Sequence, residues 1–244
     1  MRSAVSSQPS AANGVSQFER DGFQIIKSLV EHSECDLLAE ELTPLFEQQQ
    51  KAAKNNLGGL RNLLRTNLRV SKFATSAKVI SLLESAAGLP VFPVRAIFFD
   101  KNPETNWLVP WHQDLAVAVA ERIETSGFTG WSIKDETQHV HPPQEILESM
   151  VAVRLHLDDC LASNGALKVF PGTQGHGKLG AADILKWAAN NEALVCELVK
   201  GDALLMRPLL LHASSAAENP RHRRVLHIEY ATRELPNGLK WLDC

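Results

Sequence analysis

The chain has 244 residues, of which 44% are hydrophobic and 22% are charged, and its formal net charge is −3 at pH 7. This composition is typical of a globular protein that can bury a sizeable core. The negative net charge and the lack of Lys/Arg runs argue against a protein that binds nucleic acid or a membrane surface, so we expect a small-molecule partner. No apolar run is long enough to span a bilayer and no signal-type segment is found, so we expect a cytoplasmic protein.

The first third of the chain predicts mainly helices. Residues 1–14 are rich in Ser and Ala and predict a flexible tail, and a short helix that ends at Gly22 follows. Apolar residues at helical spacing predict a long amphipathic helix over 34–54 and another helix over 72–87. These helices precede the strands and are expected to flank them.

The rest of the chain predicts short strands. Residues 151–157 alternate clearly, with Arg154 and His156 on the face opposite the apolar side chains. Residues 120–148 show little periodicity, and long irregular insertions are often lids or binding loops. The order of helices and strands predicts an α+β fold with a mainly β core, in a single domain over 15–244. The expected strands are 23–27, 91–100, 111–119, 151–157, 166–170, 194–199, 203–213 and 224–231.

The strongest chemical signal is the stretch Trp111-His112-Gln113-Asp114. Residues two apart in a strand point to the same face, so His112 and Asp114 would present an imidazole and a carboxylate together. His212 stands at the end of an apolar run and would supply a third ligand. Two histidines and one carboxylate leave coordination positions open and favour non-haem Fe(II). A His-x-Asp pair alone is weak evidence, because unrelated surface pairs produce it often.

An ordered set of further motifs makes the signal specific. With the His-x-Asp stretch, these motifs resemble the phytanoyl-CoA dioxygenase family of Fe(II)- and 2-oxoglutarate-dependent oxygenases over most of the chain. They are Phe18-Glu19-Arg20-Asp21-Gly22-Phe23, Leu157-Asp158-Asp159, Asn164-Gly165-Ala166-Leu167, Pro171-Gly172-Thr173, His212-x-Ser214 with Arg223, and His227-Ile228-Glu229-Tyr230-Ala231.

The resemblance implies a fold, cofactors and a reaction. The fold would be a double-stranded β-helix (jelly-roll, cupin-like) with N-terminal flanking helices, and His112, Asp114 and His212 would ligate Fe(II). The cosubstrates would be 2-oxoglutarate and O₂, with succinate and CO₂ released as an unactivated C–H bond of a small molecule is hydroxylated. Related halogenases have a small residue in place of the carboxylate, so Asp114 favours hydroxylation.

The resemblance also implies an anchor for 2-oxoglutarate. The family spacing places an arginine for its far carboxylate eleven residues after His212, at Arg223, with Ser214 as a second ligand. Arg224 is the competitor, because a slip of one residue exchanges the two faces of a strand. Alternation favours Arg223, which would share a face with His227 and Glu229.

Other residues are candidates for the cosubstrate or the substrate. Arg95 would reach 2-oxoglutarate or the substrate, or else form an ordinary ion pair. Arg154 and His156 would bind a substrate carboxylate or make internal hydrogen bonds, and Trp107 would line the cavity or belong to the core.

The polar pocket face suggests a free amino acid or another small carboxylate as the substrate, because no Lys/Arg cluster is assigned to the phosphates of coenzyme A. The alternatives are an oxygenase of acyl-CoA or natural-product intermediates, and a cupin-like metalloenzyme that does not use 2-oxoglutarate. The oligomeric state is not predicted.

Overall fold

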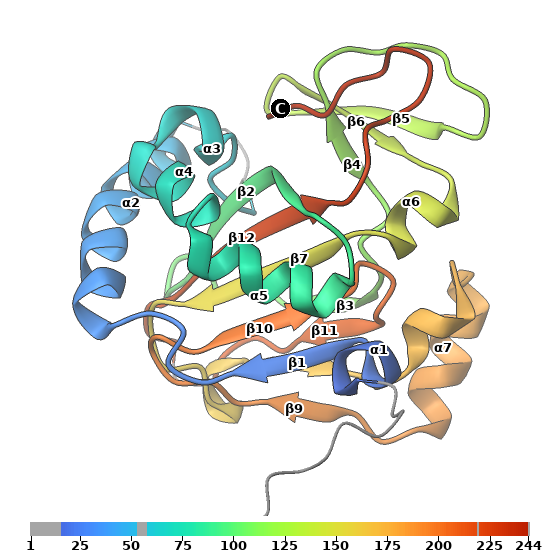
Figure 1. The fold of residues 1–244 in the computed structure, drawn as a ribbon. Coiled ribbons are helices and arrows are strands. Elements are labelled where there is room, and N and C mark those ends of the chain that lie inside the picture. The colour runs from blue at the N-terminus through green and yellow to red at the C-terminus, as the bar shows by residue number, and fades with distance from the viewer. Residues whose placement is uncertain (1–15, 53–57, 219, 244) are drawn as a thin grey trace, which may run out of the picture.

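Two antiparallel sheets form the centre of the protein (Figure 1). The computed structural model describes residues 16–52, 58–218 and 220–243. One sheet has five strands in the order β1 (Phe23–Ile26), β10 (Ala203–Met206), β7 (Val151–His156), β12 (Arg223–Ala231) and β2 (Phe92–Lys101). The other has four, in the order β3 (Val109–His112), β11 (His212–Ser214), β8 (Leu167–Val169) and β9 (Leu194–Cys196). This architecture confirms the predicted α+β class with a double-stranded β-helix core.

Helices cover the outer face of the five-stranded sheet, where α2 and α5 are conspicuous in Figure 1. Apolar side chains of these helices and of β7, β10 and β12 form one continuous buried cluster. Tyr230 of β12 donates a hydrogen bond from its hydroxyl to the carbonyl of Ala74, at 3.0 Å. The helices are α1 (Gln17–Asp21), α2 (His32–Ala52), α3 (Leu63–Thr66), α4 (Leu68–Ala74), α5 (Ala77–Ala87), α6 (Gln144–Glu148) and α7 (Ala181–Asn190), with 3-10 turns at Ala162–Asn164 and Thr173–His176.

The predicted N-terminal helices need one correction. Gly22 ends α1 in the left-handed region, at φ 76°, as expected for a glycine helix stop. The helix predicted over 72–87 is wrong as one element, because α4 and α5 are separate. Thr75 and Ser76 break it, since their hydroxyls donate to the last carbonyls of α4 and offer the backbone an alternative to helix. The tail over 1–14 and the expected helix end at residue 54 lie outside the described residues.

Two predicted strands are each divided. The strand expected over 203–213 ends at Met206, because Pro208 lacks a donor for the ladder, and the chain then crosses to β11 in the other sheet. The strand expected over 111–119 is also wrong, since β3 ends at His112 and β4 (Val117–Val119) belongs to a third sheet. Asp114 therefore lies in the bend between two strands, with its N–H donating to Pro208.

The prediction of an irregular insertion over 120–148 is wrong as well. This segment holds β5 (Thr129–Lys134), β6 (Thr137–His141) and α6, and β4, β6 and β5 form a three-stranded sheet. Apolar alternation is absent because most of β5 faces solvent. Trp241, which is 1% exposed, packs in the cluster beneath this sheet and forms a β-bridge with Val119. The proposal that the segment acts as a lid stays a prediction.

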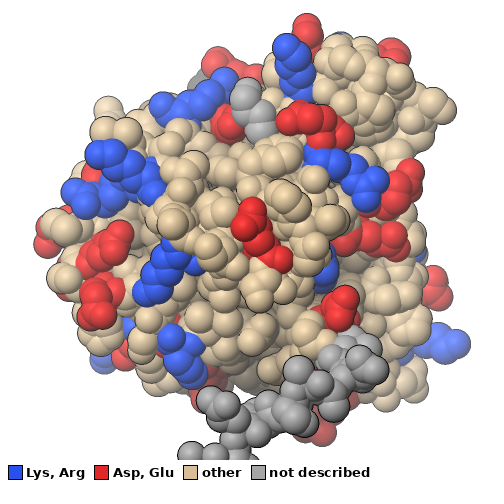
Figure 2. All heavy atoms as spheres, viewed as in Figure 1, with Lys and Arg blue, Asp and Glu red and all other residues tan. Residues whose placement is uncertain are grey.

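The face of the protein seen in Figure 2 has no single dominant charge. Figure 2 shows acidic and basic side chains interspersed over the face seen in Figure 1. Within the described ranges, we find no helix of the length and apolarity that a bilayer crossing needs.

Candidate functional site

A cavity of about 190 Å³ lies between the two large sheets. Its floor comes from β2, β7 and β12, and its opposite wall from β3, β8 and β11. Eight of the nine residues selected from the sequence line it, the exception being His156. The lining residues are Arg95, Ile97, Phe99, Lys101, Trp107, Val109, His112, Asp114, Arg154, Leu167, His212, Ser214, Arg223, His227 and Glu229.

His112, Asp114 and His212 converge on one point of this cavity. Strand pairing sets His112 directly opposite His212, and the bend after β3 brings Asp114 to both. The Nε2 atoms of His112 and His212 each lie 3.7 Å from a carboxylate oxygen of Asp114. The ligand atoms all lie within 4.8 Å of one another, so His112, Asp114 and His212 would together hold one metal ion.

The hydrogen bonds of both histidines suit metal binding. Nδ1 of His112 lies 2.9 Å from the carbonyl of Pro110, and Nδ1 of His212 lies 2.8 Å from the carbonyl of Leu210. A ring N–H that donates to a carbonyl leaves the Nε2 lone pair free, which is the usual outer-shell arrangement of a metal-binding histidine. The residues therefore fit a divalent transition metal.

Burial and electrostatics keep His212 and Asp114 in the forms that can bind a metal. Burial lowers the pKa of His212 to about 4, so its imidazole is neutral at physiological pH. Burial opposes ionisation of Asp114, but electrostatic interactions with the neighbouring side chains, His212 first and Arg95 among them, outweigh it and lower the pKa of this carboxyl to about 2. A neutral imidazole and an ionised carboxylate are the forms that ligate metals.

The same cavity holds an excess of positive charge. Lys101 and Arg223 are directly paired across β2 and β12, and they are 2% and 4% exposed. Arg154 lines the same cavity, and burial with the nearby Arg223 lowers its pKa to about 10. The ion pairs found among the described residues give none of these three cations a carboxylate partner. Buried cations of this kind call for an anionic ligand.

Arg223 and Arg224 lie on opposite faces of β12, as alternation predicted. Arg223 lines the cavity and donates to the carbonyl of Gly165. Arg224 faces the helices and forms a two-pronged ion pair with Asp158, at 2.6 and 2.8 Å. Arg224 therefore already has a charge partner, whereas Arg223 has none among the described carboxylates.

A row of polar side chains crosses the cavity floor from strand to strand. Arg95 is ion-paired with Glu229, and Nε2 of His227 lies 3.4 Å from the same carboxylate. On its other side, Nδ1 of His227 lies 3.5 Å from Arg154. The sequence predicts roles for Arg95 and Arg154 but none for His227, Glu229 or Lys101. Period-two alternation along β2 and β12 is the signal that could have found them.

His156 is buried at 2% exposure but is not among the lining residues of the cavity. Neither of its ring nitrogens has a hydrogen-bond partner among the residues that the structure describes. Burial, together with the positive charges of Arg154 and Arg223, lowers its pKa to about 3. The imidazole is thus held neutral beside the cation cluster.

We therefore predict that His156 destabilises the protein in mild acid. The unfolded chain takes up the proton near pH 6.5, whereas the folded chain resists it down to about pH 3, so stability is lost as pH falls through this window. When the pH is lowered from 7 to 5, the free energy of unfolding should fall by about 2 kcal/mol more in the wild type than in His156→Leu. Urea denaturation at both pH values measures this, and equal losses in the two proteins would contradict the assignment.

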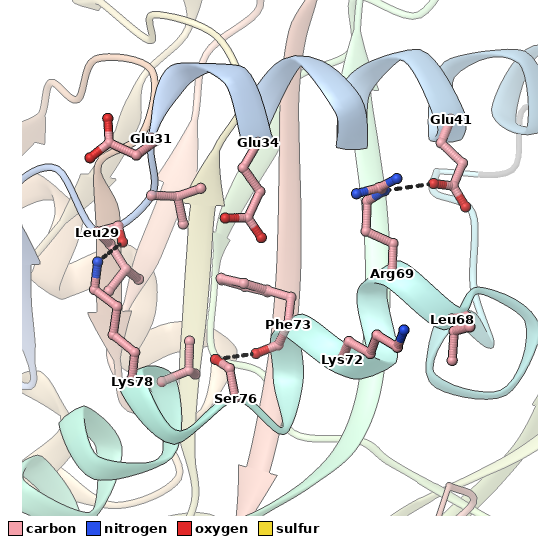
Figure 3. Close-up of a pocket in the computed structure, with 12 residues that line it drawn as sticks. Leu29, Glu31, Glu34, Glu41, Leu68, Arg69, Lys72, Phe73, Ser76 and Lys78 are labelled. Atoms are coloured by element: carbon pink, nitrogen blue, oxygen red, sulfur yellow. Dashed lines mark hydrogen bonds and ion pairs between the residues drawn. The ribbon is translucent and has the colours of Figure 1, made fainter.

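A larger hollow lies on the helical face, between α2 and the pair α4 and α5 (Figure 3). It measures about 560 Å³, but its polar groups are at the surface and are mostly satisfied. Glu41 and Arg69 form an ion pair with each side chain 40% exposed, and Lys78 donates to the carbonyl of Leu29. The smaller cavity, with its buried and unpaired charges, is the better candidate for chemistry.

Comparison with solved structures finds similar folds, among them that of SnoK, a non-haem α-ketoglutarate-dependent carbocyclase from nogalamycin biosynthesis. AviO1 from Streptomyces viridochromogenes Tue57 is 20% identical, with 91% of this chain and 94% of that chain covered and a TM-score of 0.65. EctD from S. alaskensis is 16% identical, with 93% and 80% covered and a TM-score of 0.67. HygX from Streptomyces hygroscopicus is 14% identical, with 89% and 87% covered and a TM-score of 0.62. At these identities the likeness is one of fold.

The family comparison covers most of the chain. A search of curated proteins finds no match. The family model described as phytanoyl-CoA dioxygenase (PhyH) matches residues 18–225, which include all the cavity-lining residues except Glu229 and His227. The chain therefore belongs to the phytanoyl-CoA dioxygenase family, whose members are 2-oxoglutarate-dependent oxygenases, as the ordered motifs had implied.

Proposed function

We propose that this protein is an Fe(II)- and 2-oxoglutarate-dependent dioxygenase that hydroxylates an unactivated C–H bond of a small molecule, with release of succinate and CO₂. One observation carries the proposal: a single cavity holds both a two-histidine, one-carboxylate set and a cluster of buried cations without an acidic partner among the described residues. The first suits Fe(II) and the second suits the far carboxylate of 2-oxoglutarate.

Relatives support the cofactor assignment. EctD has been solved with bound Fe and with 2-oxoglutarate and 5-hydroxyectoine, and HygX with nickel and 2-oxoglutarate. Bound Fe(II) and 2-oxoglutarate would supply the oxygen-activating chemistry.

Most of the lining residues then have a role. In the proposal, His112, Asp114 and His212 hold the metal, while Arg223 and Ser214 orient the far carboxylate of the cosubstrate. The apolar side chains of Ile97, Phe99, Trp107 and Val109 exclude water from the space between these groups. Arg95 acts indirectly, because its guanidinium is already paired with Glu229.

For the substrate we propose a small carboxylate, such as a free amino acid. Arg154 supports this, since its Nε is buried and, among the described residues, has no hydrogen-bond partner, and its guanidinium forms no ion pair with a described carboxylate. The cavity is also smaller than most ligand pockets, which leaves no room for a whole acyl-CoA. A screen of amino acids and acyl-CoAs that follows succinate release tests this, and turnover of thioesters alone would overturn it.

The proposal includes the setting of the enzyme. We place it in the cytoplasm as one domain over residues 15–244. Cys35, Cys160 and Cys196 are buried free thiols, as expected in a reducing compartment.

We predict that Arg223→Met weakens 2-oxoglutarate binding about 10- to 100-fold, the loss typical of a hydrogen bond between charged groups. Anaerobic addition of Fe(II) and 2-oxoglutarate to the wild type should produce a visible metal-to-ligand charge-transfer band, whose titration gives the affinity. Arg224→Met is the matched control and should bind like the wild type, because Arg224 pairs with Asp158 on the other face.

The titration also separates the alternatives. A wild type that gives no band would end the main proposal. Turnover of a substrate that continues unchanged in Arg223→Met without 2-oxoglutarate would favour a cupin-like metalloenzyme instead. If Arg224→Met binds 2-oxoglutarate more weakly than the wild type while Arg223→Met binds it equally well, Arg224 and not Arg223 is the anchor.

A further inference from the structure

Lys101 is a buried lysine with an unusual neighbour. It lies near the end of β2, directly opposite Arg223 of β12, and both side chains are almost fully buried. Like charges at directly opposite positions of two strands destabilise a sheet. Their coexistence inside the protein therefore indicates a ligand that neutralises them.

The contacts of Lys101 leave part of its donor capacity unused. Its Nζ donates to Oγ of Ser214 at 2.9 Å and to the carbonyl of Ser215 at 3.1 Å. An ammonium group has three donors, so one remains. Ser214, having accepted this hydrogen bond, can direct its own hydroxyl proton to a ligand.

Arg223 contributes further unused donors at the same place. Its Nη1 is directed to the carbonyl of Gly165 and to Sγ of Cys160, while its Nε is buried and has no hydrogen-bond partner in the described part of the chain. The free donors of Lys101, Ser214 and Arg223 therefore line the same cavity, and Lys101 and Arg223 lie six residues along the β2–β12 pairing from Arg95 and Glu229.

We propose that Lys101 is a further cosubstrate-binding residue, which joins Arg223 and Ser214 in a three-point clamp on the carboxylate remote from the metal. This inference rests on the proposed function and extends it, because the clamp would select a 2-oxo dicarboxylic acid over a 2-oxo monocarboxylic acid. A carboxylate held by two cations and a hydroxyl is stabilised far more than a methyl group in the same place, which would leave both cations buried and unpaired.

The charge balance supports the same conclusion. Burial, with Arg223 and Arg154 nearby, lowers the pKa of Lys101 to about 7, so the ammonium is disfavoured while the cavity lacks an anion. A bound carboxylate would supply the missing charge and favour the protonated amine. The cation–π contact with Trp107, 5.7 Å from Nζ to the ring centroid, holds the side chain in the cavity.

The test compares two 2-oxo acids of equal chain length, 2-oxoglutarate and 2-oxopentanoate. The second acid has a methyl group in place of the far carboxylate. Binding to the Fe(II)-loaded protein is measured anaerobically from the charge-transfer band. In Lys101→Met, the affinity for 2-oxoglutarate should fall about 10- to 100-fold, while the affinity for 2-oxopentanoate stays unchanged or rises. Lys101→Gln keeps a hydrogen-bond donor but no charge, so its affinity for 2-oxoglutarate should lie between those of the wild type and Lys101→Met.

Each other result has a distinct meaning. If the wild type binds neither acid, the proposed function and this inference both fall. If the wild type binds 2-oxoglutarate and Lys101→Met binds it equally well, only the inference falls. Equal losses for both acids in Lys101→Met and Lys101→Gln would overturn it too, since they would mark Lys101 as a structural tie for the Ser214–Ser215 turn. Retained binding of Co(II) alone by each variant verifies that its metal end is folded.

Discussion

His112→Ala is expected to lose metal binding almost completely while the protein stays folded. The side chain of His112 is 36% exposed, so its truncation opens no buried cavity, in contrast to that of His212, which is 5% exposed. Loss of one of three protein ligands should reduce Fe(II) or Co(II) affinity by more than the roughly 10- to 100-fold that loss of an outer-shell partner costs. Anaerobic competition against a chelator, read from the Co(II) absorption spectrum, measures the change.

His227→Gln is the matched control for this experiment. His227 is the one other histidine among the residues that line the cavity, and it lies on the floor beside Glu229 and Arg154. If the metal is held by the triad, this variant should keep its affinity within about tenfold, as for an outer-shell change. If the metal affinity of His227→Gln falls as far as that of His112→Ala, the metal is bound on the five-stranded sheet, with His227 as a ligand.

Much of this site could be predicted because its parts carry local signals. His112 and His212 each lie in a short motif that can be found in the sequence. The direct pairing of β3 with β11 then brings the two side chains together. The reason given for Asp114 was wrong in detail: it meets His112 through a bend after β3, not through strand alternation. Gln113 holds that bend, with its side chain bonded to the carbonyls of Gly177 and Leu209.

The rest of the site depends on contacts that no local pattern encodes. Arg95 and Glu229 are 134 residues apart, and only the register of β2 against β12 pairs them. Lys101 ends a strand, where a lysine is normally exposed, and its burial results from the position of Ser214 on the opposite wall. The strand β5 escaped prediction for the related reason that most of its side chains face solvent.

The second large effect is expected from the buried ion pair of Arg95 and Glu229. Their side chains are 12% and 5% exposed, and each opposes the burial penalty of the other: Glu229 raises the pKa of Arg95, and Arg95 lowers that of Glu229. Removal of one partner leaves an uncompensated buried charge, so Glu229→Met should lower the free energy of unfolding by roughly 3–5 kcal/mol. The double variant with Arg95→Met should recover much of this, because an apolar pair of similar volume is often neutral. Urea denaturation of the metal-free protein measures all three variants.

The pH dependence of the two single variants should differ, and this separates a charge effect from a packing effect. In Arg95→Met, the remaining Glu229 can take up a proton, so its folded-state pKa rises above the unfolded value. The folded state then binds more protons, and stability falls as pH rises from about 5.5 to 8, by at most about 1.4 kcal/mol per pH unit. In Glu229→Met, the remaining Arg95 cannot release its proton, so its penalty is constant over the same range. If both variants have the same pH profile as the wild type, the pair contributes through packing alone.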